Sequence, residues 1–563
     1  MTTTPGGMLL VLAVLVPFAG VLAGLVLGGR NPQRVALVTL VLGTGIALAV
    51  ADAWMRSGNA LTYLLGGWAP PLGVALRADG RSVAMLLAIA VVICGIGVYA
   101  CADFGTPADR REARAPFTFW LLLLAVWGSL NLVFVSGDLF TLYVALELLT
   151  FAGVPLVCLD GRGETLRAAL RYLLYALLGS VMYLLGAVLL YGAYGTLDIP
   201  LLAARIRPES AVWAAAALMT TGLLAKTALF PLHLWLPPAH AGAPAAASAV
   251  LSALVIKGSW FLVVRLWFDV LPGVVTFPSA QFLGALGAAA ILVFSIVALR
   301  QERLKLLIAY STLAQIGYLF LMFPLAFDAA GHLVAGGALA GGMMQAISHA
   351  TAKAAMFMAA GSIYAALGHD RIDGLAGVAR ALPISALAFA VGGLALMGVL
   401  PSGAYLAKKL LLDAAAGSGQ WWWEAVLLAG GVLTSSYVVL VVARVLRRSG
   451  TPVVLAQPVS RLAQSAALAL AVCSLLLALA TLGPLPASLI KNPLAPAEMV
   501  SLLLTVAGGA ALAFAFGTRP PPLAPVDALG GAFARADALL RRWPVASLSL
   551  LVVAGLFGWT LRA

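Results

Sequence analysis

Charged residues are scarce in this chain of 563 residues, because Asp, Glu, Lys and Arg together make up only 10% of it. A soluble globular domain carries about 25% of them, so the scarcity excludes that class. Hydrophobic residues make up 63%, and the mean hydropathy is +1.04. This composition predicts a polytopic membrane protein. The formal net charge of +13 then comes from arginines that anchor loops at the membrane surface, and no nucleic acid is expected as a partner.

Motifs for redox and metal chemistry are missing as well. The four cysteines form no CxxC pair, which argues against a metal site or a disulfide framework. His233 and His240 are separated by two prolines and lack a third ligand, so no metal site is predicted. A dinucleotide-binding glycine loop and paired haem histidines are also missing. We therefore expect no cofactor and no enzymatic centre in this chain; if it belongs to an oxidoreductase, the catalytic centres lie on other subunits.

Long apolar runs dominate the sequence instead. A run of roughly 20 apolar residues is long enough to cross a bilayer as a helix. Sixteen such spans are predicted, near 8–28, 33–54, 81–102, 116–136, 138–159, 168–193, 211–236, 242–268, 278–299, 304–326, 332–366, 383–412, 424–446, 463–484, 497–517 and 545–561. The first run lacks a basic start, so we interpret it as a first span rather than a cleaved signal.

Other segments receive different interpretations. Segment 61–76 is short and broken by proline, which predicts a position at the membrane interface. The run 332–366 is longer than one span needs, and Gly336, Gly337, Gly341 and Gly342 favour a kinked or tilted helix. Segment 518–544 is either an amphipathic helix on the membrane surface or a plain linker. The tryptophans at 421–423 are typical of an interfacial aromatic belt.

The basic residues between the spans predict a topology. Connections after odd-numbered spans hold about 21 Lys and Arg, and the other connections and the termini hold about 8. Because cytoplasmic loops carry the excess of positive charge, the odd connections are expected to be cytoplasmic. Both termini would then face outward across a bacterial cytoplasmic membrane.

Lysines lie where a permanent charge is expensive. Five of the seven fall inside apolar spans, whereas nearly all of the 27 arginines lie between spans or at their ends; these five are Lys226, Lys257, Lys353, Lys408 and Lys409. A charge at membrane depth costs roughly 2.5–3.5 kcal/mol on the insertion scale. Arginine cannot lose its charge in a protein, but a desolvated lysine can release its proton. The pattern therefore predicts proton transfer through the membrane.

One acidic residue, Glu147, is deep inside a span. A lone buried carboxylate needs a proton or a partner, and Lys226 is the candidate partner. A pair that closes and opens would be a two-state switch, because separation allows the lysine to deprotonate. The alternative is a static pair that only joins two helices, although permanent buried pairs stabilise poorly.

Two spans are predicted to be interrupted beside a lysine. Pro231 follows Lys226 by five residues, and Pro401 and Gly403 precede Lys408. Proline breaks a helix, and broken helices at membrane depth occur where they line a cavity or are packed in protein. The recurrence suggests two related halves, as in transporters built from repeats.

A polar line through the membrane is predicted along Lys226, Lys257, His349, Lys353 and Lys408. His349 and Lys353 are four residues apart and therefore share one helix face. A lysine can also extend its amine to the headgroups; this alternative fits Lys409 and Lys408, near a span end, but not Lys257 or Lys353. His349 could equally be a packing histidine. Asp138, at a span boundary, either admits protons to the line or caps the helix.

At these residues the chain resembles the antiporter-like proton-translocating family. That family comprises large subunits of Mrp-type cation/proton antiporters, membrane subunits of respiratory complex I and those of membrane-bound hydrogenases. The resemblance covers roughly residues 80–450, and the phrase 225–265 is the most specific and looks closest to the Mrp D-type subunit. The matching segments are ALELLTFAGVPL, AKTALFPLHLWLPPAHAGAPAAASAVLSALVIKGSWFLVVR, RLKLLIAYSTLAQIGYLFL, SHATAKAAMFMAAGSI and GVLPSGAYLAKKLLL.

The resemblance implies a fold and a role for each matching residue. The implied fold is all-α, with about 14 core helices, two inverted five-helix repeats and, here, about two extra C-terminal helices. The repeats would occupy 116–270 and 276–450, between N-terminal helices at 1–115 and a C-terminal part at 451–563. Glu147 and Lys226 look like the family's fifth-span carboxylate and seventh-span lysine, Lys257 like the eighth-span relay base. His349 and Lys353 resemble the polar pair of the eleventh span, and Lys408 the terminal residue of the twelfth. The phrase GVLPSGAY departs from the family, which usually has two prolines and Gly-Phe there.

The expected function is proton translocation as a membrane subunit of a multi-subunit complex, with Na+ or K+ as a possible exchanged ion and a Mrp D-like subunit as the first interpretation. One alternative is a proton-pumping membrane subunit of a complex I-like or hydrogenase-type oxidoreductase. A second alternative, of another class, is a scaffold subunit whose buried charges only fix helix packing.

Overall fold

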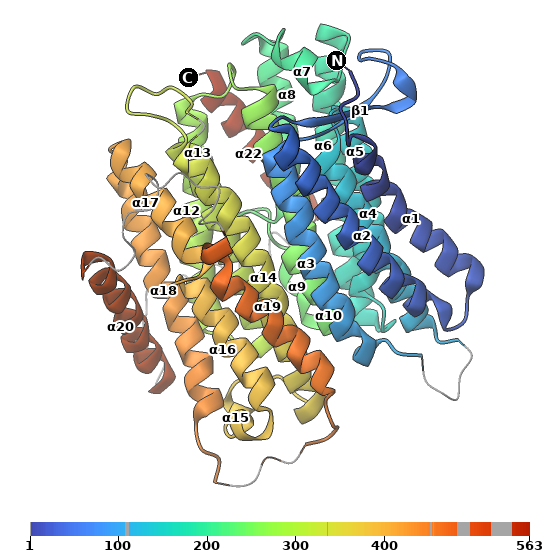
Figure 1. The fold of residues 1–563 in the computed structure, drawn as a ribbon. Helices are drawn as coiled ribbons and strands as arrows, with labels where there is room; N and C mark the ends of the chain where they lie inside the picture. The colour runs from blue at the N-terminus through green and yellow to red at the C-terminus, as the bar shows by residue number, and fades with distance from the viewer. Residues whose placement is uncertain are drawn as a thin grey trace. The chain divides into compact units, whose positions relative to one another are not determined.

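The computed structural model describes residues 2–106, 112–334, 336–450, 453, 455–480, 496–518 and 543–562. These residues are mostly helical and pack into two compact units (Figure 1). Unit 1 comprises Met1–Thr227, Gly242–Thr276 and Ala554–Ala563, and unit 2 comprises Ala228–Ala241 and Phe277–Val553. The predicted repeat boundaries and the inverted relation of the repeats stay predictions.

In the described part of the first half of the chain, ten α-helices precede residue 251. The last of them opens a span that contains two π-helical turns. The α-helices are α1 Met8–Leu27, α2 Asn31–Ser57, α3 Gly80–Asp103, α4 Arg114–Val135, α5 Leu139–Val157, α6 Gly163–Tyr194, α7 Ile199–Ala203, α8 Ser210–Thr227, α9 Leu236–Gly242 and α10 Ala245–Val250. The π-helical turn η2 Leu251–Val255, the α-helix α11 Ile256–Arg265 and the π-helical turn η3 Leu266–Val270 continue α10 as one span.

The described part of the second half of the chain is also helical. Its helices are α12 Phe277–Leu299, α13 Leu304–Leu325, α14 Gly337–Leu367, α15 Val378–Ala381, α16 Pro383–Met397, α17 Gly403–Gly417, α18 Trp421–Leu446, α19 Arg461–Ala480, α20 Pro496–Thr518 and α22 Trp543–Arg562, with one 3-10 turn, η4 Asp373–Leu375. Segment 518–544, for which a linker and an amphipathic helix were both open, lies almost wholly outside the described residues.

The membrane prediction is confirmed. Within the described part of the chain, twelve helices are long and apolar enough to cross a membrane, and Pro383–Met397, Met499–Ala515 and Leu548–Arg562 are shorter apolar helices. Each of the sixteen predicted spans coincides with helical structure, and the two predicted to be interrupted are broken. Most of the run 332–366 lies in the 31-residue helix α14, Gly337–Leu367, and its predicted kink or tilt stays a prediction. At 1.5 Å per residue it measures about 46 Å, longer than a hydrocarbon core of about 30 Å.

Segment 61–76 contains strand structure that the all-α prediction did not include. Strand β1 (Leu61–Leu64) pairs antiparallel with β2 (Ala75–Ala78), and the 3-10 turn η1 (Leu65–Gly67) follows β1. The phrase LTYL contains β-favouring residues, and the glycines and prolines between the strands suit a turn. The segment does not cross the membrane, and its position at the interface stays a prediction.

A close helix contact in unit 1 positions the residues discussed below. A Cβ added to Gly222 of α8 would collide with the backbone carbonyl of Gly179 in α6. A Cβ added to Gly179 would lie 2.5 Å from the Gly222 carbonyl oxygen and 3.3 Å from Cγ of Lys226. Two facing glycines therefore allow the backbones to touch, as small residues do between membrane helices. This contact places Lys226 next to α6.

We expect Gly222→Leu to separate α6 from α8 and to destabilise the protein. Overpacking typically costs about 1–3 kcal/mol, and more where backbone must move. Thermal unfolding of the detergent-solubilised protein, followed by size-exclusion chromatography, measures the effect. Gly192→Leu, in an open part of α6 where nothing lies within 4 Å of the added atom, is the matched control. Equal melting temperatures for the two variants would contradict this packing.

Candidate functional site

Unit 1 brings together the two residues that the sequence paired. Lys226 Nζ lies 3.3 Å from Glu147 Oε1, 2.8 Å from Thr150 Oγ1 and 3.4 Å from the Leu146 carbonyl oxygen. The side chains are 6% and 15% exposed for Lys226 and Glu147. Ser180 Oγ donates a hydrogen bond to the same carboxylate oxygen. The predicted ion pair between α5 and α8 is therefore present.

Two hydroxyl groups would allow the Lys226–Glu147 ion pair to open. The lysine amine donates to Thr150, one turn after Glu147 on α5. The carboxylate of Glu147 accepts a hydrogen bond from Ser180. Each charged group would therefore keep a hydrogen-bond partner if the pair opened. An unpaired charge at this depth would otherwise be costly. The geometry can support a proton that stays on Lys226 in the closed pair and leaves in the open one.

The helix that carries Lys226 ends at once after it. Helix α8 stops at Thr227, residues 228–235 are not helical, and α9 begins at Leu236. Pro231 lies in this interruption, as predicted. The carbonyl groups of a last helical turn carry partial negative charge, so the amine of Lys226 lies at the end of α8 that favours a cation.

Lys257 lies in unit 1 at the start of α11 and is fully buried. Its Nζ donates to the carbonyl oxygen of Ser252, at 2.8 Å, within the π-helical turn η2. Such turns widen a helix and often occur at functional sites. Thr227, next to Lys226, shares a 2.9 Å hydrogen bond with Ser259, two residues after Lys257. This hydroxyl pair fixes α8 against α11 at the level of both lysines.

In unit 2 the predicted pair of α14 is buried on one helix. His349 and Lys353 are 0% exposed. Lys353 Nζ donates to Ser311 Oγ at 2.5 Å and to the Ile308 carbonyl oxygen at 3.2 Å, both on α13. The amine has no carboxylate partner among the described residues, so it is held by neutral acceptors alone.

Lys408 lies beside the second interruption. Helix α16 ends at Met397, α17 begins at Gly403, and Pro401 lies between them, so the predicted break is present. Ser402 caps α17 by accepting from the backbone N–H of Tyr405 at 3.1 Å. Helix α19 supports the break: the Ala478 N–H donates to the Pro401 carbonyl at 3.3 Å, and Ser474 Oγ donates to the Ser348 carbonyl of α14 at 3.1 Å.

Two buried basic residues of unit 2 were missed by sequence reasoning. Lys305 is not among the predicted site residues, but it lies in the first turn of α13, 7% exposed, with its Nζ 5.2 Å from the ring centroid of Tyr364. His240 was considered only as a metal ligand, but it is 0% exposed in α9 and stacks on Phe357 at 4.8 Å. Phe357 and Tyr364 lie about one and three turns after Lys353 on α14, so the three basic groups lie along this helix as one cluster.

Only part of that cluster could be recognised in advance. Lys305 directly opens an uncharged apolar run, which was a usable signal, whereas the burial of His240 depends on the fold of residues 228–241. Lys409 is also buried, at 6% exposed, which does not fit the alternative that its amine reaches the headgroups.

An arginine network closes one end of unit 1. Arg81 Nη2 bonds Asp79 at 2.7 Å and Asp269 at 2.6 Å, and the buried Arg265 lies 2.9 Å from Asp269. Burial raises the pKa of Asp79, but the guanidinium groups and the Ser82 N–H outweigh this and hold that pKa below its usual value. These residues line a cavity of about 240 Å³. Asp138, for which a proton-admitting role and a cap were both open, caps α5 by accepting from the Thr141 N–H at 2.8 Å.

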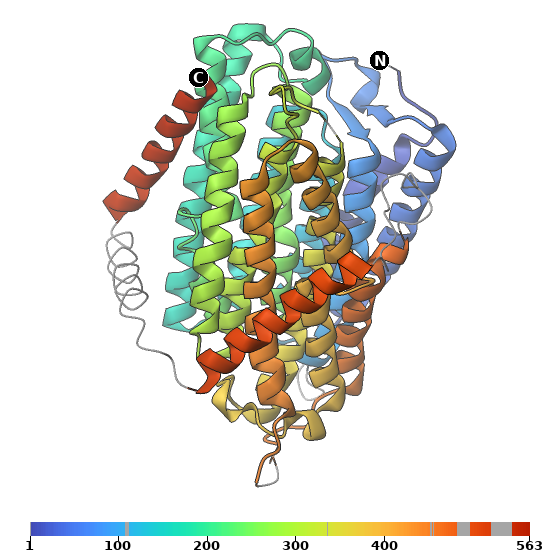
Figure 2. The same ribbon diagram turned by 90° about the vertical axis from the view of Figure 1, so that its left-hand side faces the viewer.

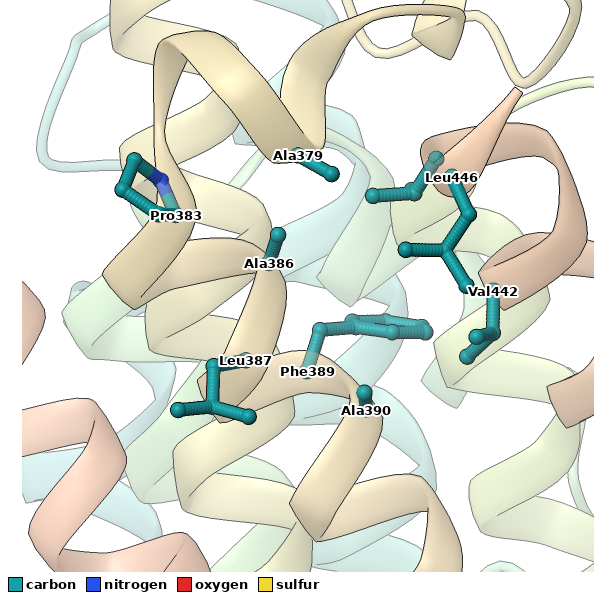
Figure 3. A pocket seen from close by; sticks show the side chains of 9 residues that line it. Ala379, Pro383, Ala386, Leu387, Phe389, Ala390, Val442 and Leu446 are labelled. Atoms are coloured by element: carbon teal, nitrogen blue, oxygen red, sulfur yellow. The ribbon is translucent and has the colours of Figure 1, made fainter. Parts of the chain in front are cut away.

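A second cavity, in unit 2, is apolar. A pocket of about 330 Å³ lies between α16 and α18, and Figure 3 shows Phe389 pointing toward Val442 across it. All nine lining residues are apolar. No group of three or more His, Cys, Asp or Glu residues that could hold a metal occurs in the described part of the chain.

The site residues therefore fall into two sets. Unit 1 holds Glu147, Lys226 and Lys257, and unit 2 holds His349, Lys353 and Lys408 together with His240 and Lys305. Within unit 1, Glu147 and Lys226 are in direct contact. The continuation of the polar line from one set to the other stays a prediction.

Comparisons with known proteins agree on one family. Residues 136–434 match the profile of the NADH:quinone oxidoreductase/Mrp antiporter transmembrane family. The N-type subunit of the NADH-quinone oxidoreductase of Desulforudis audaxviator is 34% identical over 377 residues, which cover 66% of this chain and 72% of the relative. The D-type subunit of the Na(+)/H(+) antiporter of Alkalihalophilus pseudofirmus is 29% identical over 421 residues, 72% of this chain and 80% of the relative.

Solved structures show the same fold. A chain of the Mrp complex from Dietzia superposes with a TM-score of 0.74 at 23% identity, over 90% of this chain and 97% of that one. A chain of the archaeal membrane-bound sulfane sulfur reductase has the same TM-score and identity, over 90% and 99%. At this identity the likeness establishes the architecture.

Proposed function

Because this chain belongs to the NADH:quinone oxidoreductase/Mrp antiporter transmembrane family, we propose that it is a proton-translocating membrane subunit of a multi-subunit complex. The relatives named above are themselves subunits, of an oxidoreductase and of an antiporter. The chain is a multi-pass membrane protein of the transporter type. Its proposed partners are other membrane subunits, protons and, in the antiporter case, Na+ or K+.

The buried Lys226–Glu147 pair carries this proposal. Charged groups inside a membrane are expensive and usually mark ion or proton pathways. Here each charged group of the pair contacts a hydroxyl group, and the pair lies at the end of an interrupted helix. A pure packing function would be served better by apolar side chains.

The proposed path uses the predicted residues in order. A proton enters near Lys257, crosses the line of buried amines and His349, and leaves near Lys408. While Glu147 contacts Lys226, the lysine keeps its proton; when the pair opens, the proton passes along the line. His240 and Lys305 extend the set of exchanging groups around Lys353.

The orientation in the membrane is part of the same proposal. The excess of Lys and Arg after the odd-numbered spans places those connections on the cytoplasmic side. The chain would then lie in a bacterial cytoplasmic membrane with its N-terminus outside.

Two couplings are compatible with the family. A Mrp D-like antiporter subunit is favoured by the phrase 225–265 and by the antiporter relative that matches over 80% of its own length. A subunit of a proton-pumping oxidoreductase is favoured by the higher identity, 34%, to the N-type oxidoreductase subunit.

Isolation of the complex distinguishes these couplings. We expect a tagged chain, extracted in mild detergent, to bring down further membrane subunits, which mass spectrometry identifies. In proteoliposomes with a fluorescent pH probe, the antiporter predicts Na+- or K+-dependent proton movement without an electron donor. Proton movement that requires a reductant would instead establish the oxidoreductase. A chain that purifies alone would contradict both.

The scaffold alternative makes the opposite prediction for the amines. If buried charges only fixed helix packing, charge-neutral replacements at Lys257 and Lys353 would leave transport unchanged.

A further inference from the structure

The amine of Lys408 lies in the gap that the missing side chain of Gly431 leaves on the surface of α18. A Cβ added to Gly431 of α18 would lie 2.6 Å from Lys408 Nζ and 3.6 Å from its Cε. Any larger residue at position 431 would therefore displace the amine. The room for the Lys408 side chain is made by this one glycine.

Helix α20 covers the same gap. The Cγ2 atom of Thr505 lies 3.3 Å from the position of that added Cβ, so the lysine amine and the threonine methyl meet at one point of α18. Thr505 is buried at 7% exposed, whereas Leu503, Leu504 and Phe514 of the same helix are 63%, 67% and 74% exposed. The buried face of α20 is therefore the one that carries Thr505.

Close packing holds α20 against α18 (Figure 1, Figure 2). A Cβ added to Gly509 would lie 2.9 Å from the backbone nitrogen of Ser436 and 2.9 Å from the Val432 carbonyl oxygen. A Cβ added to the residue before it, Gly508, would meet only the Val432 side chain, at 3.4 and 3.8 Å. Position 509 therefore needs glycine, and position 508 tolerates a side chain.

Packing rather than hydrogen bonding holds the Lys408 amine. Lys226 and Lys353 each bond a hydroxyl group, but no hydrogen bond or ion pair of Lys408 is found among the described residues. The nearby hydroxyl groups are engaged within their own helices: Thr505 donates to the Ser501 carbonyl at 2.8 Å and Ser435 to the Gly431 carbonyl at 3.0 Å. The position of this amine therefore depends on what closes the gap.

We propose that α20 is the positioning element of Lys408: it covers the gap at Gly431 and holds the amine against α18. Helix α20 lies beyond the residues 136–434 that match the family profile, so this assigns a role to an additional part of the chain. The inference rests on the proposed function only in that Lys408 is taken as a proton-transfer group.

Accessibility of position 408 tests the inference without any transport assay. Lys408→Cys is made in the full chain after its four cysteines are replaced by Ala, and the complex is reconstituted in liposomes. A lipid-soluble maleimide should label Cys-substituted position 408 at least about tenfold faster when Gly509→Leu has displaced α20, as a shift of ångström size suffices for such changes. Gly508→Leu is the matched control and should leave the rate unchanged. Equal labelling in the two backgrounds would overturn the inference.

Transport by the otherwise native complex gives the second readout. We expect Gly509→Leu to lower the proton-transport rate about tenfold or more, with Gly508→Leu close to the native rate. Gly431→Ala displaces the flexible end of Lys408 and requires only a few tenths of an ångström from Thr505 of α20, so it should lower the rate similarly. Native rates for both Gly509→Leu and Gly431→Ala would overturn the positioning role. An active Lys408→Gln complex would instead refute the proton-transfer role of Lys408, which the labelling comparison does not depend on.

Discussion

Proton transport by the reconstituted complex is expected to fall by at least about 100-fold when Lys226 is replaced by Met, because a positioned proton-transfer group contributes on that scale. The amine is the only part of the residue that exchanges a proton, and it lies 3.3 Å from Glu147 Oε1 in the closed pair. Met reproduces the side chain as far as Cε and removes the charged amine. Transport is measured as acidification of proteoliposomes that carry a fluorescent pH probe.

Assembly of the variant complex should survive. The carboxylate keeps its bond from Ser180 and can take up a proton in place of the lysine partner. Where the single variant assembles poorly, the double variant Lys226→Met with Glu147→Gln removes both charges together, which leaves no unpaired ion. Co-purification of the partner subunits is the control measurement.

Lys226→Arg separates charge from proton exchange at the same position. Arginine retains the cation and the ion pair but cannot release its proton. If Lys226 transfers protons, this variant should assemble and be as inactive as Lys226→Met. Under a static joining role it should work normally, so a native rate in Lys226→Arg would refute the proposed gating. Glu147→Gln alone should also abolish transport.

Replacement of Lys353 by Met is the second change with a large expected effect. Here too we expect a loss of about 100-fold or more in proton transport, because the fully buried amine is placed to be the exchanging group of its cluster. Stability should be unchanged or higher. The Ile308 carbonyl that accepts from Lys353 also accepts from Ser311 at 2.9 Å, so removal of the amine leaves no buried group without a partner.

The combination of lost transport and retained stability distinguishes the two classes of function. If the amine only fixed the helices, the Lys353→Met complex would lose stability, and its transport rate would not depend on the charge. Ser311→Ala is the matched control, since it removes one acceptor of the amine and leaves the amine in place; a partial reduction of transport is expected. A Lys353→Met complex with a native rate would show that protons bypass this residue.

The spans and their interruptions could be predicted from sequence because both are local properties. Apolar length sets a membrane helix, and proline removes a backbone donor within one turn, so the breaks near Pro231 and Pro401 followed directly from position. The Lys226–Glu147 contact could be predicted because each was a rare buried charge in need of a partner. Burial of Lys305 could have been predicted from its place at the start of an uncharged run.

The rest depends on tertiary structure. Thr150 and Ser180 are ordinary helix residues in the sequence, and only the glycine contact between α6 and α8 brings the second of them to the pair. His240 is buried because the residues after the break fold into unit 2. The role proposed for α20 depends on which glycine faces α18. The sequence alone does not show that this is Gly509 rather than Gly508.

Helix α19 supports the helices that carry the proposed proton-transfer groups of unit 2. Its Ala478 and Ser474 bond the carbonyl groups of Pro401 and Ser348, on the break and on α14. A truncated chain that stopped after the family-matched residues would retain every proposed proton-transfer group. It would lose the hydrogen bond from Ala478 to the Pro401 carbonyl and the one that joins α19 to α14 through Ser474. The C-terminal part as far as α19 therefore supports the transport machinery, and any attempt to design a smaller functional version should retain the chain at least as far as residue 480.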